Sequence, residues 1–158
     1  IAKKIAGLLT HLGAWAPKPV QLATAKFLRD TAAVEAWKPD VIGRVRERLD
    51  AVHEGIQQLR ASGLPVDSIE PQGAIYISLR FGLAGRRTAA GKVLANNEDV
   101  RSYLLRAAAF AAVPFSAFGV APADENGWFR ASVGAVSVHD VREAMPRLRR
   151  ALLALAAC

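Results

Sequence analysis

The chain has 158 residues, of which 52% are hydrophobic and 22% charged, the balance of a globular domain and not of a disordered segment. Its 21 lysines and arginines against 14 acidic residues give a net charge of +7, which permits an anionic partner without naming one. The single cysteine, Cys158, excludes an internal disulfide framework and is typical of a reducing cytosol. No apolar run approaches the ~20 residues of a membrane-spanning helix, so we expect a cytoplasmic protein without a membrane partner.

Helical patterns fill the N-terminal part of the chain. Residues 1–12 carry apolar side chains at helical spacing, and a second short helix is expected from Pro19 to about Asp30. Residues 31–62 hold the longest helical pattern, in which Pro39 predicts a kink or a division. Trp37 is expected to pack in a core or between domains. Because the chain opens with Ile1 in the middle of a helix, we interpret it as a piece of a longer protein.

The pattern then changes to strands. In residues 73–81 Ile75, Ile77, Leu79 and Phe81 alternate with smaller or polar residues, which predicts a strand. A polar connection over residues 82–97, with a small hairpin or an excursion, leads to a helix for which Asn97 is the expected N-cap. Residues 110–115 are expected to form a short strand.

A last strand and a last helix complete the pattern. The strand WFRASVG (128–134) follows a loop, and an amphipathic helix follows over residues 138–157. Ser137 and Asp140 predict a capping box for this helix, and Pro146 predicts a bend or a delayed start. The element order predicts an α/β fold in which helices cover a small antiparallel or mixed sheet.

Several familiar motifs are incomplete in this sequence. The run GRRTAAGKV (85–93) has the wrong spacing for a phosphate-binding loop and lacks its hydroxyl residue. His11, His53 and His139 lie far apart in sequence without further ligands at metal-binding spacing, so we expect no metal site. Ser116 lacks the glycine that a nucleophile elbow needs. No recognised nucleic-acid-binding motif is present, so we expect no nucleic-acid partner.

Three segments in chain order carry a family resemblance. PQGAIYISL (71–79) is similar to a Pro-x-Gly-Ala-Phe-Tyr strand in which Ile75 replaces the aromatic residue. AAVPFSAFG (111–119) is similar to a Val-Pro-Gly-x-x-Phe-Gly stretch in which Phe115 replaces glycine. GWFRASVG (127–134) is similar to a strand that carries a substrate arginine, a position that Arg130 occupies. Together they resemble the C-terminal small domain of class I/II, fold-type I pyridoxal-phosphate-dependent aminotransferases.

Arg130 is the site residue that this resemblance implies most directly. It would bind the α-carboxylate of an amino acid or 2-oxo acid, and a planar guanidinium suits that task because it can donate two parallel hydrogen bonds. Alternation places Arg130 on one strand face with Trp128 and Ser132. The resemblance further implies substrate-side roles for Trp15, Phe118 and Gly119, whereas Tyr76 is interpreted as a packing residue of its strand.

The cofactor chemistry would lie outside this chain. Lys3 and Lys4 lack the sequence context of the family's cofactor lysine, so we expect that lysine upstream of Ile1 and no pyridoxal phosphate bound to this chain alone. The resemblance implies that residues 1–30 are an interdomain helical segment and that residues 31–158 are the small domain. The parent would be a homodimer whose partners are its own large domain and its amino-acid and 2-oxo-acid substrates.

Alternative functions stay open at this point. Aminotransferase-like domains also serve as ligand sensors in transcription regulators, and the same fold supports decarboxylases, lyases and acyl-transferring synthases. A free-standing basic α/β binding module is the alternative from a different class.

Overall fold

The computed structural model describes residues 2–13 and 16–156 of the chain. Residues 1–42 and 43–158 form two compact units. The sequence predicts a domain boundary after residue 30, whereas the division between the units falls inside the long helix α3 (Thr31–Ala61). The assignment of residues 1–30 to an interdomain segment stays a prediction.

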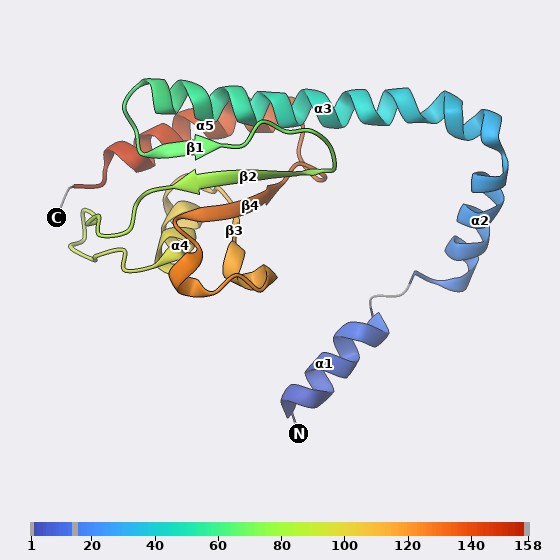
Figure 1. Cartoon of the computed structure of the whole chain (residues 1–158), viewed down its shortest axis with the longest axis horizontal. Coiled ribbons are helices and arrows are strands. Elements are labelled where there is room, and N and C mark those ends of the chain that lie inside the picture. The colour runs from blue at the N-terminus through green and yellow to red at the C-terminus, as the bar shows by residue number, and fades with distance from the viewer. Residues whose placement is uncertain (1, 14–15, 157–158) are drawn as a thin grey trace. The chain divides into compact units, whose positions relative to one another are not determined.

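The first unit consists of helices. They are α1 (Ala2–Gly13), α2 (Lys18–Arg29) and the beginning of α3 (Figure 1). Pro19 lies in the first turn of α2 and Asp30 ends it, as predicted. The Asp30 carboxylate also accepts the backbone N–H of Ala33 at 3.0 Å, so this residue separates two helices and caps the second. Trp37 is 53% exposed and meets Phe27 edge to face at 5.9 Å, so it does not lie in a core of this unit, and the alternative of packing between domains stays a prediction.

Helix α3 continues through Pro39, and the predicted division is wrong. A proline inside a helix removes one backbone donor, and the hydrogen bonds on either side can carry the helix on. The helix ends as the sequence predicts, at Ala61. Gly63 then takes a left-handed conformation with φ +85°, and Leu64 donates to the carbonyl of Leu59 at 3.2 Å.

A four-stranded sheet lies in the second unit. Its strands are β1 (Val66–Ser68), β2 (Tyr76–Phe81), β3 (Val113–Pro114) and β4 (Trp128–Ser132). The order is β1-β2-β4-β3, and every neighbouring pair is antiparallel. The small sheet with helices confirms the predicted fold class. Strand β2 starts three residues later than predicted because Ala74, with φ +59°, interrupts the extended backbone.

The core lies on one face of this sheet. Inward side chains of β2 and β4 pack with α3, α4 (Asn97–Ala108) and α5 (Val138–Leu153), and among them Leu79, Phe129, Ile56, Leu104 and Leu148 are fully buried. Phe81 meets Phe129 edge to face at 5.6 Å. At Gly55 the helices α3 and α5 approach so closely that an added Cβ would lie 2.6 Å from Met145 Sδ. The opposite face of β2 and β4 is left exposed or half-buried.

Helix ends and connections test several local predictions. The N-cap of α4 is Asn96, whose side chain accepts the N–H of Asp99 at 3.0 Å, so the prediction of Asn97 is wrong by one residue. Asn97 is instead buried as the first residue of the helix. The capping box of Ser137 and Asp140 is confirmed, and α5 starts at Val138 despite Pro146. The small hairpin predicted between residues 82 and 97 is confirmed by the pairing of Arg87 with Val93.

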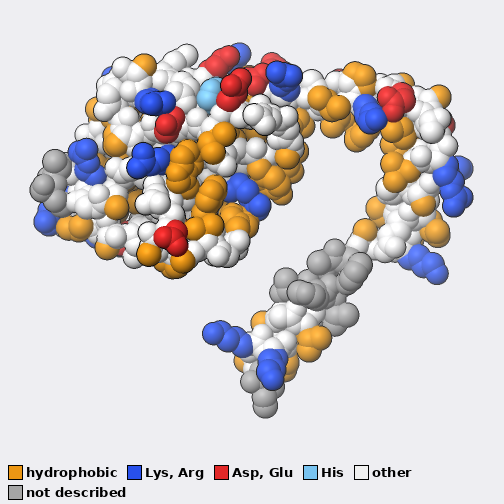
Figure 2. All heavy atoms as spheres, in the orientation of Figure 1, with side chains coloured by type: hydrophobic (Ala, Val, Ile, Leu, Met, Phe, Trp, Pro, Cys, Tyr) orange, Lys and Arg blue, Asp and Glu red, His pale blue; other side chains and the backbone are white. Residues whose placement is uncertain are grey.

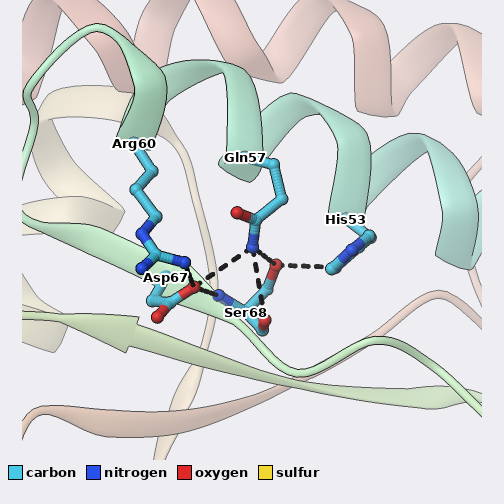
Figure 3. Close-up of polar contacts among 5 residues, drawn as sticks. All are labelled: His53, Gln57, Arg60, Asp67 and Ser68. Atoms are coloured by element: carbon cyan, nitrogen blue, oxygen red, sulfur yellow. Dashed lines mark hydrogen bonds and ion pairs between the residues drawn. The ribbon is translucent and has the colours of Figure 1, made fainter.

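A polar cluster fastens the edge strand β1, which the sequence did not predict, to α3. The Gln57 amide donates to Asp67 Oδ1 at 3.1 Å and to Ser68 Oγ at 3.0 Å (Figure 3). His53 Nδ1 lies 2.8 Å from the same hydroxyl, and Arg60 pairs with Asp67 at 3.1 Å. Burial raises the pKa of Asp67, but the Gln57 hydrogen bond, the Ser68 N–H and Arg60 outweigh it and hold that pKa below its ordinary value. These hydrogen bonds and the ion pair attach β1 to α3, because a strand of three residues has few side chains that can pack against the helix.

Candidate functional site

Arg130 stands in the middle of β4 on the sheet face that the core does not use. Its strand neighbours are Ser78 of β2 and Val113 of β3. Trp128 and Ser132 share its face, while Phe129 and Ala131 are buried on the other. The grouping that alternation predicted is confirmed, and the guanidinium is directed away from the core.

Two aromatic rings lie against the Arg130 guanidinium. Its Cζ lies 4.2 Å from the ring centroid of Tyr76 and 3.6 Å from that of Phe118, both within cation–π distance. Among the residues that the structure describes, no carboxylate forms an ion pair with Arg130. The aromatic rings therefore contact the positive charge of Arg130. The N–H donors of its guanidinium stay available to an acceptor on a bound ligand.

Arg130 borders a cleft of about 790 Å³. Tyr76 and Ser132 lie beside it, and Arg101 and Leu105 of α4 form another part of the wall. On the visible face of this unit, hydrophobic side chains form patches among backbone and polar atoms, with basic and acidic side chains beside them (Figure 2). A mostly apolar hollow with a few polar groups is the usual form of a small-molecule site.

The second cation of the cleft already has a partner. The Arg101 Nε donates to Glu98 at 2.7 Å, and a second guanidinium nitrogen also contacts that carboxylate. The hydrogen bond from Arg101 is the main reason why the pKa of Glu98 is lowered, and it raises the pKa of Arg101. This pairing leaves Arg130 as the better candidate for an added carboxylate.

The loop between β3 and β4 brings Phe118 to Arg130. Residues Phe115–Phe118 form a single 3₁₀ turn, η1, and Pro122–Asp124 form a second, η2. Glu125 is 5% exposed, and its carboxylate accepts the backbone N–H of Ser116 at 2.6 Å. The Phe115 ring stacks on Trp128 with centroids 6.5 Å apart. One buried carboxylate and one ring contact therefore fix this loop against the start of β4.

The predicted site residues differ in their position relative to Arg130. It brings Phe118 onto Arg130, and it shows Gly119 ending η1 with φ +93°, a conformation that favours glycine and gives a structural reason for this residue. Trp15 lies outside the described residues. Tyr76, interpreted from the sequence as a packing residue, is 42% exposed and stacks on Arg130. Its place in the alternation, opposite to buried Ile77, is the signal that it shares the face of Arg130.

A metal site and a membrane-spanning helix each have requirements against which the described residues can be compared. In the described part of the chain, no three His, Cys, Asp or Glu residues are grouped so that they could hold a metal ion. No helix over residues 2–13 and 16–156 is long and apolar enough to cross a membrane.

Known proteins similar in sequence to this chain are aminotransferases, although no protein-family model matches it. The chain is 39% identical over 83 residues to a probable aspartate/prephenate aminotransferase of Rickettsia felis, an alignment that covers 52% of this chain and 19% of that protein. The chain thus spans about a fifth of the length of this curated relative.

Solved structures give the same class. The aspartate aminotransferase of Rhizobium meliloti superposes with a TM-score of 0.60 at 33% identity, covering 71% of this chain and 26% of the other. The aromatic aminotransferase of Pyrococcus horikoshii superposes with a TM-score of 0.63 at 29% identity, covering 85% and 31%. The chain therefore matches a portion of the fold-type I aminotransferases. Within that class it resembles the C-terminal part, as its three motifs predicted.

Proposed function

We propose that the whole protein is an aminotransferase that moves an amino group between an amino acid and a 2-oxo acid with pyridoxal phosphate. The observation that carries this proposal is Arg130: a cation on an open sheet face, covered by two rings and facing a cleft. In this proposal Arg130 binds the substrate α-carboxylate through two parallel hydrogen bonds, which fix the orientation of the substrate as well as its charge. The relatives' names favour this activity over the other functions of the fold.

The residues of this cleft fit the substrate and not the cofactor. The lining holds Arg130, Ser116 and Ser132 but no lysine, so it can take a carboxylate and offers no amine for an imine. When bound to such an enzyme, pyridoxal phosphate supplies the electron sink for the reacting carbon. The proposal therefore assigns carboxylate recognition to this chain and the cofactor lysine to the rest of the protein.

The proposal also includes contacts of this chain with the rest of its protein and with a second subunit. In the first unit Val20, Leu22, Leu28 and Trp37 are each more than half exposed, which is costly for apolar side chains in water. Contact with the protein's own large domain would remove this cost. A homodimer in the cytoplasm is likewise part of the proposal and stays a prediction.

Substitution of Arg130 tests the proposed function in the full-length protein. Arg130→Ala should weaken binding of both amino acid and 2-oxo acid by about 30- to 4000-fold, since truncating one partner of a hydrogen-bonded charge pair costs about 2–5 kcal/mol. Steady-state kinetics with each substrate, and equilibrium binding of pyridoxal phosphate, would separate the two ligands. Cofactor binding should change little.

Arg80→Ala is the matched control. Arg80 lies on the same open face, on β2, but its Nε donates to the carbonyl of Asn126 at 3.1 Å and it does not line the cleft. It should leave both KM values within about twofold, as surface substitutions usually do. Unchanged KM values in Arg130→Ala would refute the assignment.

A further inference from the structure

The two rings on Arg130 belong to different elements and are held by different means. Tyr76 is the first residue of β2, and the register of the sheet pairs it with Ser132, two residues from Arg130. Phe118 is the last residue of η1 and approaches from the β3–β4 loop. Neither position follows from the other, so two separate parts of the fold converge on one guanidinium.

The ring of Phe118 is not part of the hydrophobic core. It is 45% exposed, and its contact with Arg130, at 3.6 Å, is the ring interaction that the structure gives it. The loop beneath it is secured by the buried Glu125 carboxylate on the Ser116 N–H. The loop is thus firmly anchored, and yet it places the large apolar ring of Phe118 where the ring adds no packing to the core.

Cation–π contacts with two rings constrain the guanidinium without using its hydrogen bonds. The donors of arginine lie in the plane of the group, whereas cation–π contacts use its faces. An arginine held in this way has already lost much of the side-chain freedom that it would otherwise lose when a ligand binds. The donors are therefore positioned in advance, and their planar fork suits a planar carboxylate.

We propose that Tyr76 and Phe118 are positioning residues that clamp Arg130 for the substrate carboxylate. This inference rests on the proposed function and goes beyond it, because it assigns the affinity of the site partly to residues that act through Arg130. Phe118 contributes its ring as one wall of the clamp, and the Glu125–Ser116 bond keeps that wall in place.

The experiment replaces the ring at Phe118 while keeping a similar bulk. In the full-length protein loaded with pyridoxal phosphate, Phe118→Leu should raise KM for amino acid and 2-oxo acid about three- to tenfold, the loss expected for one cation–π contact. The kcat should stay within about twofold. Succinate, a carboxylate with no amino or oxo group to react, should lose affinity by the same factor in isothermal titration calorimetry. Phe118→Tyr, which keeps the ring, should restore both values.

Phe115→Leu is the matched control. It makes the same change in the same 3₁₀ turn, but the Phe115 ring stacks on Trp128 and not on Arg130. A purely structural role of the turn would make the two leucine variants alike in KM, in succinate affinity and in melting temperature, and would overturn the proposal. Tyr76→Leu supplies an independent test should Phe118→Leu fail to fold, with the same expected loss.

The outcomes separate the two proposals. If Arg130→Ala leaves substrate and succinate binding unchanged, the proposed function fails. If Arg130→Ala weakens binding while Phe118→Leu and Tyr76→Leu do not, the clamp alone is wrong. If all three weaken succinate binding and Phe118→Tyr restores it, the clamp is supported.

Discussion

Gly127 provides the sharpest test of how the site strand is positioned. It precedes β4 with φ +78°, and a Cβ added there would lie 2.7 Å from the backbone oxygen of Phe81 and 3.3 Å from its carbonyl carbon. The same two residues are joined by a hydrogen bond of 2.8 Å from the Phe81 N–H to the Gly127 carbonyl. The backbone of β2 therefore approaches here too closely for any side chain.

The cost of Gly127→Ala has two sources. A left-handed conformation costs a non-glycine residue about 1–2 kcal/mol. The clash is with backbone and not with the end of a flexible side chain, so β4 must shift, and shifts forced by overpacking cost about a further 1–3 kcal/mol. We therefore expect the free energy of unfolding to fall by about 2–5 kcal/mol.

Gly63→Ala isolates the first of these sources. Gly63 has nearly the same φ, +85°, but no atom lies within 4 Å of its added Cβ. This variant should lose only about 1–2 kcal/mol, the strain of the left-handed backbone. The comparison cancels the shared conformational cost and leaves the close approach of β2 to Gly127.

Urea denaturation of the chain measures both variants. With Trp15→Phe and Trp37→Phe as the common background, Trp128 is the only tryptophan left, and it lies directly after Gly127, so its fluorescence reports the region under test. The free energies follow from linear extrapolation at a common slope. Equal losses in Gly127→Ala and Gly63→Ala would refute the argument from the close backbone approach.

Two further predictions concern polar contacts outside the cleft. The side-chain hydrogen bond from Lys92, at 2.5 Å, and the N–H of Ala95 lower the pKa of Asp99, so its contribution to stability is complete above about pH 4 and is lost as the pH falls through the folded pKa. Asp99→Asn should therefore flatten the loss of stability between about pH 4 and pH 2 in urea denaturation, and an unchanged acid limb would contradict this. Gln57→Leu should cost about 1–3 kcal/mol because it removes the amide that bonds Asp67 and Ser68, whereas Gln58→Leu, at the exposed next position, should stay within about 0.5 kcal/mol. Equal costs at these two glutamines, by the same denaturation assay, would count against the role of the cluster in fixing β1.

The sequence could predict what depends on short-range periodicity. Alternation along residues 128–133 is enough to place Arg130 opposite the buried Phe129 and Ala131. Helical spacing likewise places Val141, Leu148 and Leu152 on the buried stripe of α5. In both cases each residue's environment follows from its immediate neighbours in the chain.

The sequence did not predict features that depend on contacts between residues far apart in the chain. Strand β1 has three residues, too few to show a period of two, and it exists because Val66 pairs with Phe81 and because Gln57 bonds its end. The helix that Pro39 is predicted to divide continues through it, since the hydrogen bonds around the proline outweigh the one it removes. The role of Glu125 could not be predicted either, because its only visible feature in sequence is an acidic residue in a polar loop.

The environment of Arg130 shows why contacts between distant segments of the chain matter for function. Arg60 and Arg101 of the same unit contact carboxylates, as arginines held for structural reasons usually do. Arg130 instead is in cation–π contact with two rings, brought by β2 and by the β3–β4 loop, and in the described residues no carboxylate pairs with it. A fold that needed this cation for stability would gain more from an acidic neighbour, since charge-assisted hydrogen bonds are stronger than stacking at an exposed site. The arrangement therefore favours an arginine held ready for a carboxylate that arrives from outside the chain.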